Sequence, residues 1–67
     1  MMEERIMPLA MVTALEGVTQ SQKRAVIASV TETLSLSLSV PPASVRVLVT
    51  EIPADTWGVA GAPLSDR

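Results

Sequence analysis

One long stretch with the spacing of a helix lies between two short runs of strand-forming residues, and this order constrains the fold more than any other feature. Residues 8–15 form a nearly continuous apolar run, which is typical of a buried strand. Residues 45–51 are rich in β-branched side chains and indicate a second strand. A helix between two such strands makes a βαβ unit, with a right-handed crossover and parallel strands. We therefore predict an α/β fold built on a single βαβ unit.

The helix is expected to run from about residue 20 to about residue 39. Thr19, followed three residues later by Gln22, matches a capping box at its start. Residues 35–40 alternate strictly between serine and an apolar side chain, which alone favours a strand, but no turn residue separates them from the helical pattern. The prolines at 41 and 42 then end the helix. Its apolar face is formed by Val26, Ile27, Val30, Leu34 and Leu38.

The rest of the chain adds little to this unit. Residues 57–63 contain two glycines and a proline, which predicts a short C-terminal hairpin or turn. Residues 8–67 are expected to form one domain, and residues 1–7 an N-terminal extension to it.

A chain of this size is expected to need partners. A domain of about 60 residues buries only about 60% of the surface that its unfolded chain exposes, so a lone core is marginal. The 67 residues include no cysteine and no histidine, which excludes disulfides and the usual zinc ligands as a source of stability. Yet 48% of the residues are hydrophobic, and one helix on a two-stranded sheet leaves a sheet face open. We expect an oligomer held by apolar contacts.

Several other partners are disfavoured. The net charge is −2 and the five basic residues are scattered, so we expect no nucleic-acid binding. No apolar run approaches the roughly 18 residues of a membrane span, and the first residues lack the apolar core of a signal peptide. We expect a cytoplasmic protein with no membrane partner.

The composition also limits the chemistry. Without histidine and cysteine, a Ser-His-Asp triad and a thiol nucleophile are excluded. The absence of both residues also excludes a Cys/His metal site, so no metal is expected. The carboxylates have no spacing that forces a glycosidase-like pair, and the glycines near the C-terminus form a poor phosphate loop. Pro8, Arg46 and Trp57 remain as candidates. Each also has a structural interpretation: a proline at a strand edge, an arginine paired with an acid such as Glu51, and a packed tryptophan.

The order and spacing of short motifs over residues 8–65 resemble the 4-oxalocrotonate tautomerase family. The resemblance implies βαβ subunits assembled as hexamers, a trimer of dimers. It also implies cofactor-independent proton transfer between the enol and keto forms of small dicarboxylates. The motifs are Pro8-(x)8-Gly17, Thr19-x-x-Gln22-Lys23, Val40-Pro41-Pro42, Ser44-Val45-Arg46-Val47, Thr50-Glu51 and Trp57-Gly58.

The resemblance assigns a role to each candidate. Pro8 would be the catalytic acid and base once its nitrogen is the free N-terminus. Such amines have a pKa of about 7.7–8.0, and a nearby arginine with an apolar pocket lowers it toward neutrality. Arg46, also catalytic, would bind a substrate oxygen across a subunit interface. Trp57 would be an aromatic wall of the substrate pocket, and Leu15 and Val59 would line its apolar side.

Two positions depart from the family pattern. Many members have an arginine after the glycine that ends the first strand, where this chain has Val18, and neither Lys23 nor Arg24 replaces it. The substrate could therefore be a dicarboxylate, a monoacid or another carbonyl compound, or a partner chain could supply the arginine. Met7 precedes Pro8, and an internal prolyl nitrogen is a non-basic amide. Met7 is itself a plausible start, since methionine before a small residue is commonly removed.

The sequence thus leaves three functions open. The first is a homo-oligomeric isomerase, with a hexamer favoured, acting on a small unsaturated oxo acid similar to 2-hydroxymuconate. The alternative is a non-catalytic or half-catalytic subunit of a hetero-oligomeric tautomerase, paired with a paralogous chain. The third is a proline-dependent hydration or dehalogenation, for which no carboxylate is clearly assigned to activate water.

Overall fold

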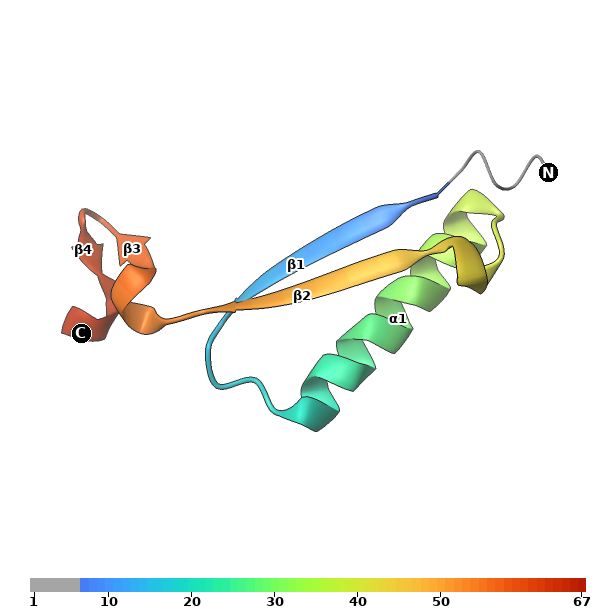
Figure 1. The fold of residues 1–67 in the computed structure, drawn as a ribbon. Coiled ribbons are helices and arrows are strands. Elements are labelled where there is room, and N and C mark those ends of the chain that lie inside the picture. The colour runs from blue at the N-terminus through green and yellow to red at the C-terminus, as the bar shows by residue number, and fades with distance from the viewer. Residues whose placement is uncertain (1–6) are drawn as a thin grey trace.

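The structure, a computed structural model, describes residues 7–67 and contains the predicted βαβ unit (Figure 1). Strand β1 (Leu9–Leu15) leads into helix α1 (Gln20–Leu38), and strand β2 (Arg46–Ile52) follows. Apart from Met7, the predicted N-terminal extension lies outside the described residues. The predicted fold class is confirmed.

The C-terminal segment forms the predicted short hairpin. Strands β3 (Gly58–Val59) and β4 (Ala62–Pro63) pair antiparallel. They lie beyond the far end of the main sheet, away from the N-terminus (Figure 1). Three 3₁₀ turns complete the part of the chain that the structure describes: Pro42–Ser44, Ala54–Thr56 and Leu64–Asp66.

The two long strands pair in parallel along all seven residues of each. One further hydrogen bond extends the ladder at either end. The Arg46 N–H donates to the Pro8 carbonyl oxygen at 2.9 Å, and the Glu16 N–H donates to the Ile52 carbonyl oxygen at 3.0 Å. The residues just outside both ends of β1 are thereby fixed against β2.

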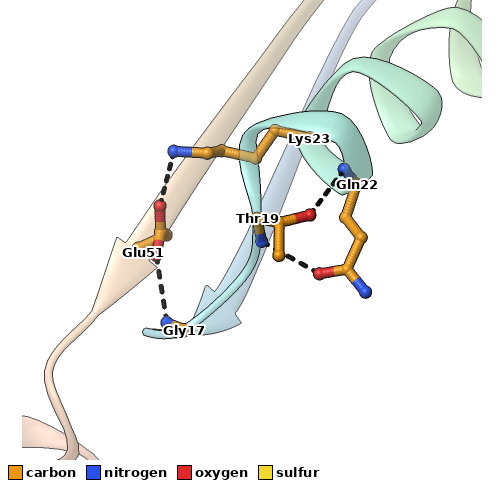
Figure 2. Close-up of polar contacts among 5 residues, drawn as sticks. All are labelled: Gly17, Thr19, Gln22, Lys23 and Glu51. Atoms are coloured by element: carbon orange, nitrogen blue, oxygen red, sulfur yellow. Dashed lines mark hydrogen bonds and ion pairs between the residues drawn. The ribbon is translucent and has the colours of Figure 1, made fainter.

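Helix α1 begins and ends with local hydrogen bonds that the sequence dictates. In the predicted capping box, Thr19 Oγ1 accepts from the Gln22 N–H at 3.0 Å and Gln22 Oε1 accepts from the Thr19 N–H at 2.9 Å (Figure 2). At the other end, Ser39 adopts a left-handed conformation with φ of 56°, and the Val40 N–H donates to the Ser35 carbonyl oxygen. The alternating segment is therefore helical up to Leu38, as predicted, because helix-end hydrogen bonds outweigh its strand-like pattern.

The side chains of the sheet alternate between two unequal environments. One face lies against α1, and its side chains are half-buried. The opposite face carries large apolar side chains in the open: Leu9 is 57% exposed, Met11 70% and Leu48 50%. Among the described residues only Val40 and Val45 are buried, at 5% and 8% exposure. Residues 7–67 of a single subunit therefore form no ordinary hydrophobic core.

The predicted apolar face of α1 is only partly covered. Val26, Val30 and Leu34 are half-buried, whereas Ile27 and Leu38 are exposed. The two-stranded sheet is too narrow to cover the whole stripe, and α1 packs mainly on β2.

The subunit is elongated, with extents of 50 × 25 × 14 Å. Its radius of gyration is 15.5 Å, whereas a compact domain of this length has about 11 Å. Within residues 7–67, no helix has the length and apolar character needed to cross a lipid bilayer.

Candidate active site

Pro8 and Arg46 lie together at one end of the sheet. The 2.9 Å hydrogen bond between their backbones fixes this neighbourhood, since Pro8 precedes β1 and Arg46 begins β2. The Arg46 side chain is exposed, and its Nη1 donates to the carbonyl oxygens of Ala43 at 2.8 Å and Val45 at 3.4 Å. The guanidinium group is thus held over the 3₁₀ turn that leads into β2, at the end of the sheet where both strands begin.

Leu15, Trp57 and Val59 lie at the opposite end. Leu15 is the last residue of β1, whose seven residues span about 20 Å at roughly 3.3 Å each. Trp57 follows a 3₁₀ turn, and its carbonyl oxygen accepts from the Leu64 N–H at 2.7 Å. Val59 lies in β3 of the hairpin that projects from this end (Figure 1). One subunit therefore brings Pro8 and Arg46 together but keeps them apart from the three apolar residues.

The loop between β1 and α1 carries Val18, which is half-buried, at the position where the resemblance implies an arginine. Lys23, in the helix turn that follows, is bound to Glu51 with Nζ 2.8 Å from Oε2 (Figure 2). Its charge is neutralised by this carboxylate. The contact also assigns Glu51 to Lys23 rather than to Arg46, which lies at the other end of β2.

Two glutamates at this end have a role that the sequence alone did not suggest. Glu51 Oε1 also accepts from the Gly17 N–H at 3.2 Å, and Glu16 Oε2 accepts from the Ala54 N–H at 3.1 Å. The hydrogen bond from Lys23, followed by that from Gly17, lowers the pKa of the Glu51 carboxyl below its ordinary value of 4.5. The predicted parallel topology could have indicated this role, because it brings the carboxyl ends of both strands, and with them Glu16 and Glu51, to one edge of the sheet.

Shallow hollows lie on the surface away from Pro8 and Arg46. One of about 210 Å³ lies between β1 and α1 and is lined largely by apolar atoms. Another, of about 250 Å³, lies on the C-terminal hairpin between Asp55 and Pro63. Within the part of the chain that the structure describes, no three His, Cys, Asp or Glu side chains are grouped to hold a metal ion.

Comparison with known proteins agrees with this architecture. A family model described as "Tautomerase enzyme" matches residues 8–67. The crystal structure of TomN, a 4-oxalocrotonate tautomerase homologue in the tomaymycin biosynthetic pathway, superposes with a TM-score of 0.85 at 35% identity, over 90% of this chain and 92% of its own. The chain belongs to the 4-oxalocrotonate tautomerase family.

Sequence relatives of this tautomerase chain point the same way. A probable tautomerase of Ralstonia nicotianae is 49% identical over 59 residues, which are 88% of this chain and 84% of that protein. A 2-hydroxymuconate tautomerase of Pseudomonas putida is 44% identical over 55 residues, covering 82% and 87%. The family resemblance predicted from the ordered motifs is confirmed.

Proposed function

We propose that this tautomerase is an isomerase that interconverts the enol and keto forms of a small unsaturated oxo acid similar to 2-hydroxymuconate, without a cofactor. The observation that carries the proposal is the backbone hydrogen bond that joins Pro8 to Arg46. It brings a potential amine base and a fixed cation to one end of the sheet. The similarity to 2-hydroxymuconate tautomerase supports the substrate class.

Pro8 acts as base and acid once Met7 is removed. In the 67-residue chain its nitrogen belongs to an amide. In a chain that begins at Pro8 the nitrogen is a secondary amine, which takes a proton from the enol hydroxyl and returns one to carbon. The nearby Arg46 charge disfavours the ammonium form, which lowers the amine pKa from about 8 toward neutrality. The family match, which begins at residue 8, supports this start.

Arg46 binds and polarises the substrate. Its two side-chain hydrogen bonds within residues 7–67 both use Nη1, so none of these residues accepts from Nη2 or Nε, and both can donate to a carboxylate or a carbonyl oxygen. A guanidinium group already fixed by backbone carbonyls loses little conformational freedom on binding. It therefore stabilises the negative charge that develops on the oxygen during proton transfer.

The complete site requires more than one subunit. Pro8 and Arg46 lie at one end of the subunit, while Leu15, Trp57 and Val59 lie at the other. A second copy, docked through the open apolar face of the sheet, can bring its hairpin end to the Pro8 end of the first. The sparse core and elongated shape support such a homo-oligomer, and a hexamer is the assembly we propose.

Val18 favours a second candidate. A chain without the arginine that grips one carboxylate is suited to be the half-catalytic subunit of a hetero-oligomer, in which a paralogous chain supplies that arginine. Lys23 cannot serve as the replacement while Glu51 holds it.

A comparison of three chains tests the proposal. One begins at Pro8, one retains Met7 as a matched control, and one has all 67 residues; intact mass verifies each start. With 2-hydroxymuconate and with a phenylenolpyruvate-like enol, only the chain that begins at Pro8 should be active. Its kcat/KM should depend on an amine with a pKa near neutrality. Equal activity of the Met7 chain would exclude the Pro8 amine as the base. An inactive but assembled Pro8 chain would favour the hetero-oligomer.

A further inference from the structure

The carboxyl ends of β1 and β2 are tied together by two crossed side-chain hydrogen bonds. We propose that Glu16 and Glu51 are positioning residues, each of which fixes the segment that follows the other strand, and that they thereby hold Val18 and Trp57 for substrate binding. The importance of these two positions rests on the proposed function, because Trp57 is a proposed wall of the substrate pocket and Val18 stands where many family members have an arginine that binds a substrate carboxylate.

Glu51 fixes the loop that carries Val18. It lies in β2, yet its Oε1 accepts from the Gly17 N–H at 3.2 Å, on the segment that follows β1 (Figure 2). Gly17 has a φ of 109°, a conformation that other residues rarely adopt, so the chain turns sharply at this point. The other oxygen, Oε2, accepts from Lys23 at 2.8 Å. One carboxylate therefore sets where the loop leaves β1 and where α1 begins, on either side of Val18.

Glu16 fixes the segment that carries Trp57. Its own N–H is held by the carbonyl oxygen of Ile52 at 3.0 Å, and its Oε2 accepts from the Ala54 N–H at 3.1 Å. Ala54 begins the 3₁₀ turn that Trp57 follows, and the Trp57 N–H donates back to the Ala54 carbonyl oxygen at 3.4 Å. A continuous path of hydrogen bonds thus joins the end of β1 to the tryptophan.

The two glutamates have different chemical requirements, and this difference makes the proposal testable. Glu16 supplies one acceptor to one backbone N–H, which a glutamine carbonyl can replace. Glu51 uses both oxygens, one for a backbone N–H and one for a cationic amine. A glutamine at this position turns a donor toward one of these partners, so it cannot restore both hydrogen bonds.

Trp57 provides a direct optical probe of the arrangement, because it is the only tryptophan of the chain. In the assembled chain that begins at Pro8, Glu16→Met removes the acceptor while keeping the length of the side chain. It should shift the Trp57 emission and speed amide exchange at Ala54, and Glu16→Gln should restore both.

Glu51→Gln should leave the emission unchanged, speed amide exchange at Gly17, and raise KM with kcat preserved. Each lost hydrogen bond should raise KM by about 2- to 10-fold. Glu32→Gln, an exposed glutamate in the second half of α1, is the matched control.

Three outcomes would overturn the proposal. The first is an unchanged Trp57 emission and Ala54 exchange rate in Glu16→Met. The second is a failure of Glu16→Gln to restore them. The third is an equal loss of thermal stability in the Glu16 and Glu51 variants while their KM stays that of the wild type. That pattern would indicate a merely structural role. Fluorescence and amide exchange do not depend on turnover, so an inactive wild-type assembly would refute the proposed function while still testing the two positioning residues.

Discussion

The Arg46 N–H donates a hydrogen bond of 2.9 Å to the Pro8 carbonyl oxygen, so the main chain alone holds these two residues side by side. The contact belongs to the ladder of the parallel sheet and extends it by one step beyond Leu9. Because it involves no side-chain atom, substitution of either side chain leaves the neighbourhood intact. The roles proposed for the side chains can therefore be tested without dismantling the fold.

Arg46→Ala should lower kcat/KM by about 100- to 1,000-fold, the loss typical of removing one fixed donor from developing negative charge. Arg46→Lys should retain part of the activity, because it keeps the charge but loses the planar fork of donors. Circular dichroism and oligomer mass should match the wild type in both variants. Steady-state kinetics checks the prediction, and an unchanged kcat/KM in Arg46→Ala would contradict the proposed role.

Val18→Arg should increase the preference for a dicarboxylate over a monoacid. It places a guanidinium group on the half-buried loop position where many family members carry one. A charge-assisted hydrogen bond contributes about 1.5–3 kcal/mol, so the ratio of kcat/KM values should rise by about 10- to 100-fold. Val18→Leu, which adds bulk without charge, is the control and should not change the ratio. A similar ratio in both variants would mean that the loop does not face the distal carboxylate.

Met11→Lys should dissociate the assembly. Met11 is 70% exposed in the middle of the open sheet face. When a second copy covers this face, the lysine ammonium group would be buried there without a partner. Leu36→Lys is the matched control, since Leu36 is 73% exposed but lies on α1, away from that face. Analytical ultracentrifugation should show smaller species for the first variant only. Dissociation by Leu36→Lys alone would move the interface to the helix.

Much of the fold follows from local sequence patterns, and its exceptions have a physical cause. The capping box at Thr19 and the prolines after the helix are short-range signals, so the bounds of α1 could be predicted closely. The exposure of Ile27 and Leu38 could not be predicted, because periodicity identifies an apolar face of the helix but not how much of that face a two-stranded sheet covers.

The candidate site divides in the same way. The proximity of Pro8 and Arg46 follows from the parallel register, whereas their chemical roles came from the ordered family motifs. The hydrogen bonds of Glu16 and Glu51 join residues 38 and 34 positions apart, a distance over which no periodic pattern carries information. The separation of Trp57 from Pro8 depends on where the hairpin leaves the sheet, which a sequence motif does not specify.

The contribution of Glu51 to stability should disappear at acidic pH. Its pKa is lowered in the folded state, first by the hydrogen bond from Lys23 and then by that from Gly17. The unfolded state therefore binds the proton more readily, so the stabilisation is present above the ordinary value of 4.5 and is lost as the pH falls through the folded pKa. Thermal unfolding at fixed protein concentration should show wild type and Glu51→Gln converging below about pH 4.5. Glu32→Gln should produce no such convergence.

The turn between β3 and β4 stores strain that a single substitution should release. Ala60 and Gly61 form the two-residue loop and have φ values of 54° and 87°, a conformation suited to asparagine followed by glycine. An alanine in the left-handed region costs about 1–2 kcal/mol, and asparagine tolerates it better. Ala60→Asn should therefore raise the midpoint of thermal unfolding by several degrees, since about 1 kcal/mol corresponds to about 4–8 °C in a domain of this size.

Ala60→Val should lower the midpoint, because a β-branched side chain is strained further at positive φ. Differential scanning calorimetry at equal protein concentration distinguishes the two, and a shift of the same sign in both variants would show that the turn is not strained as described.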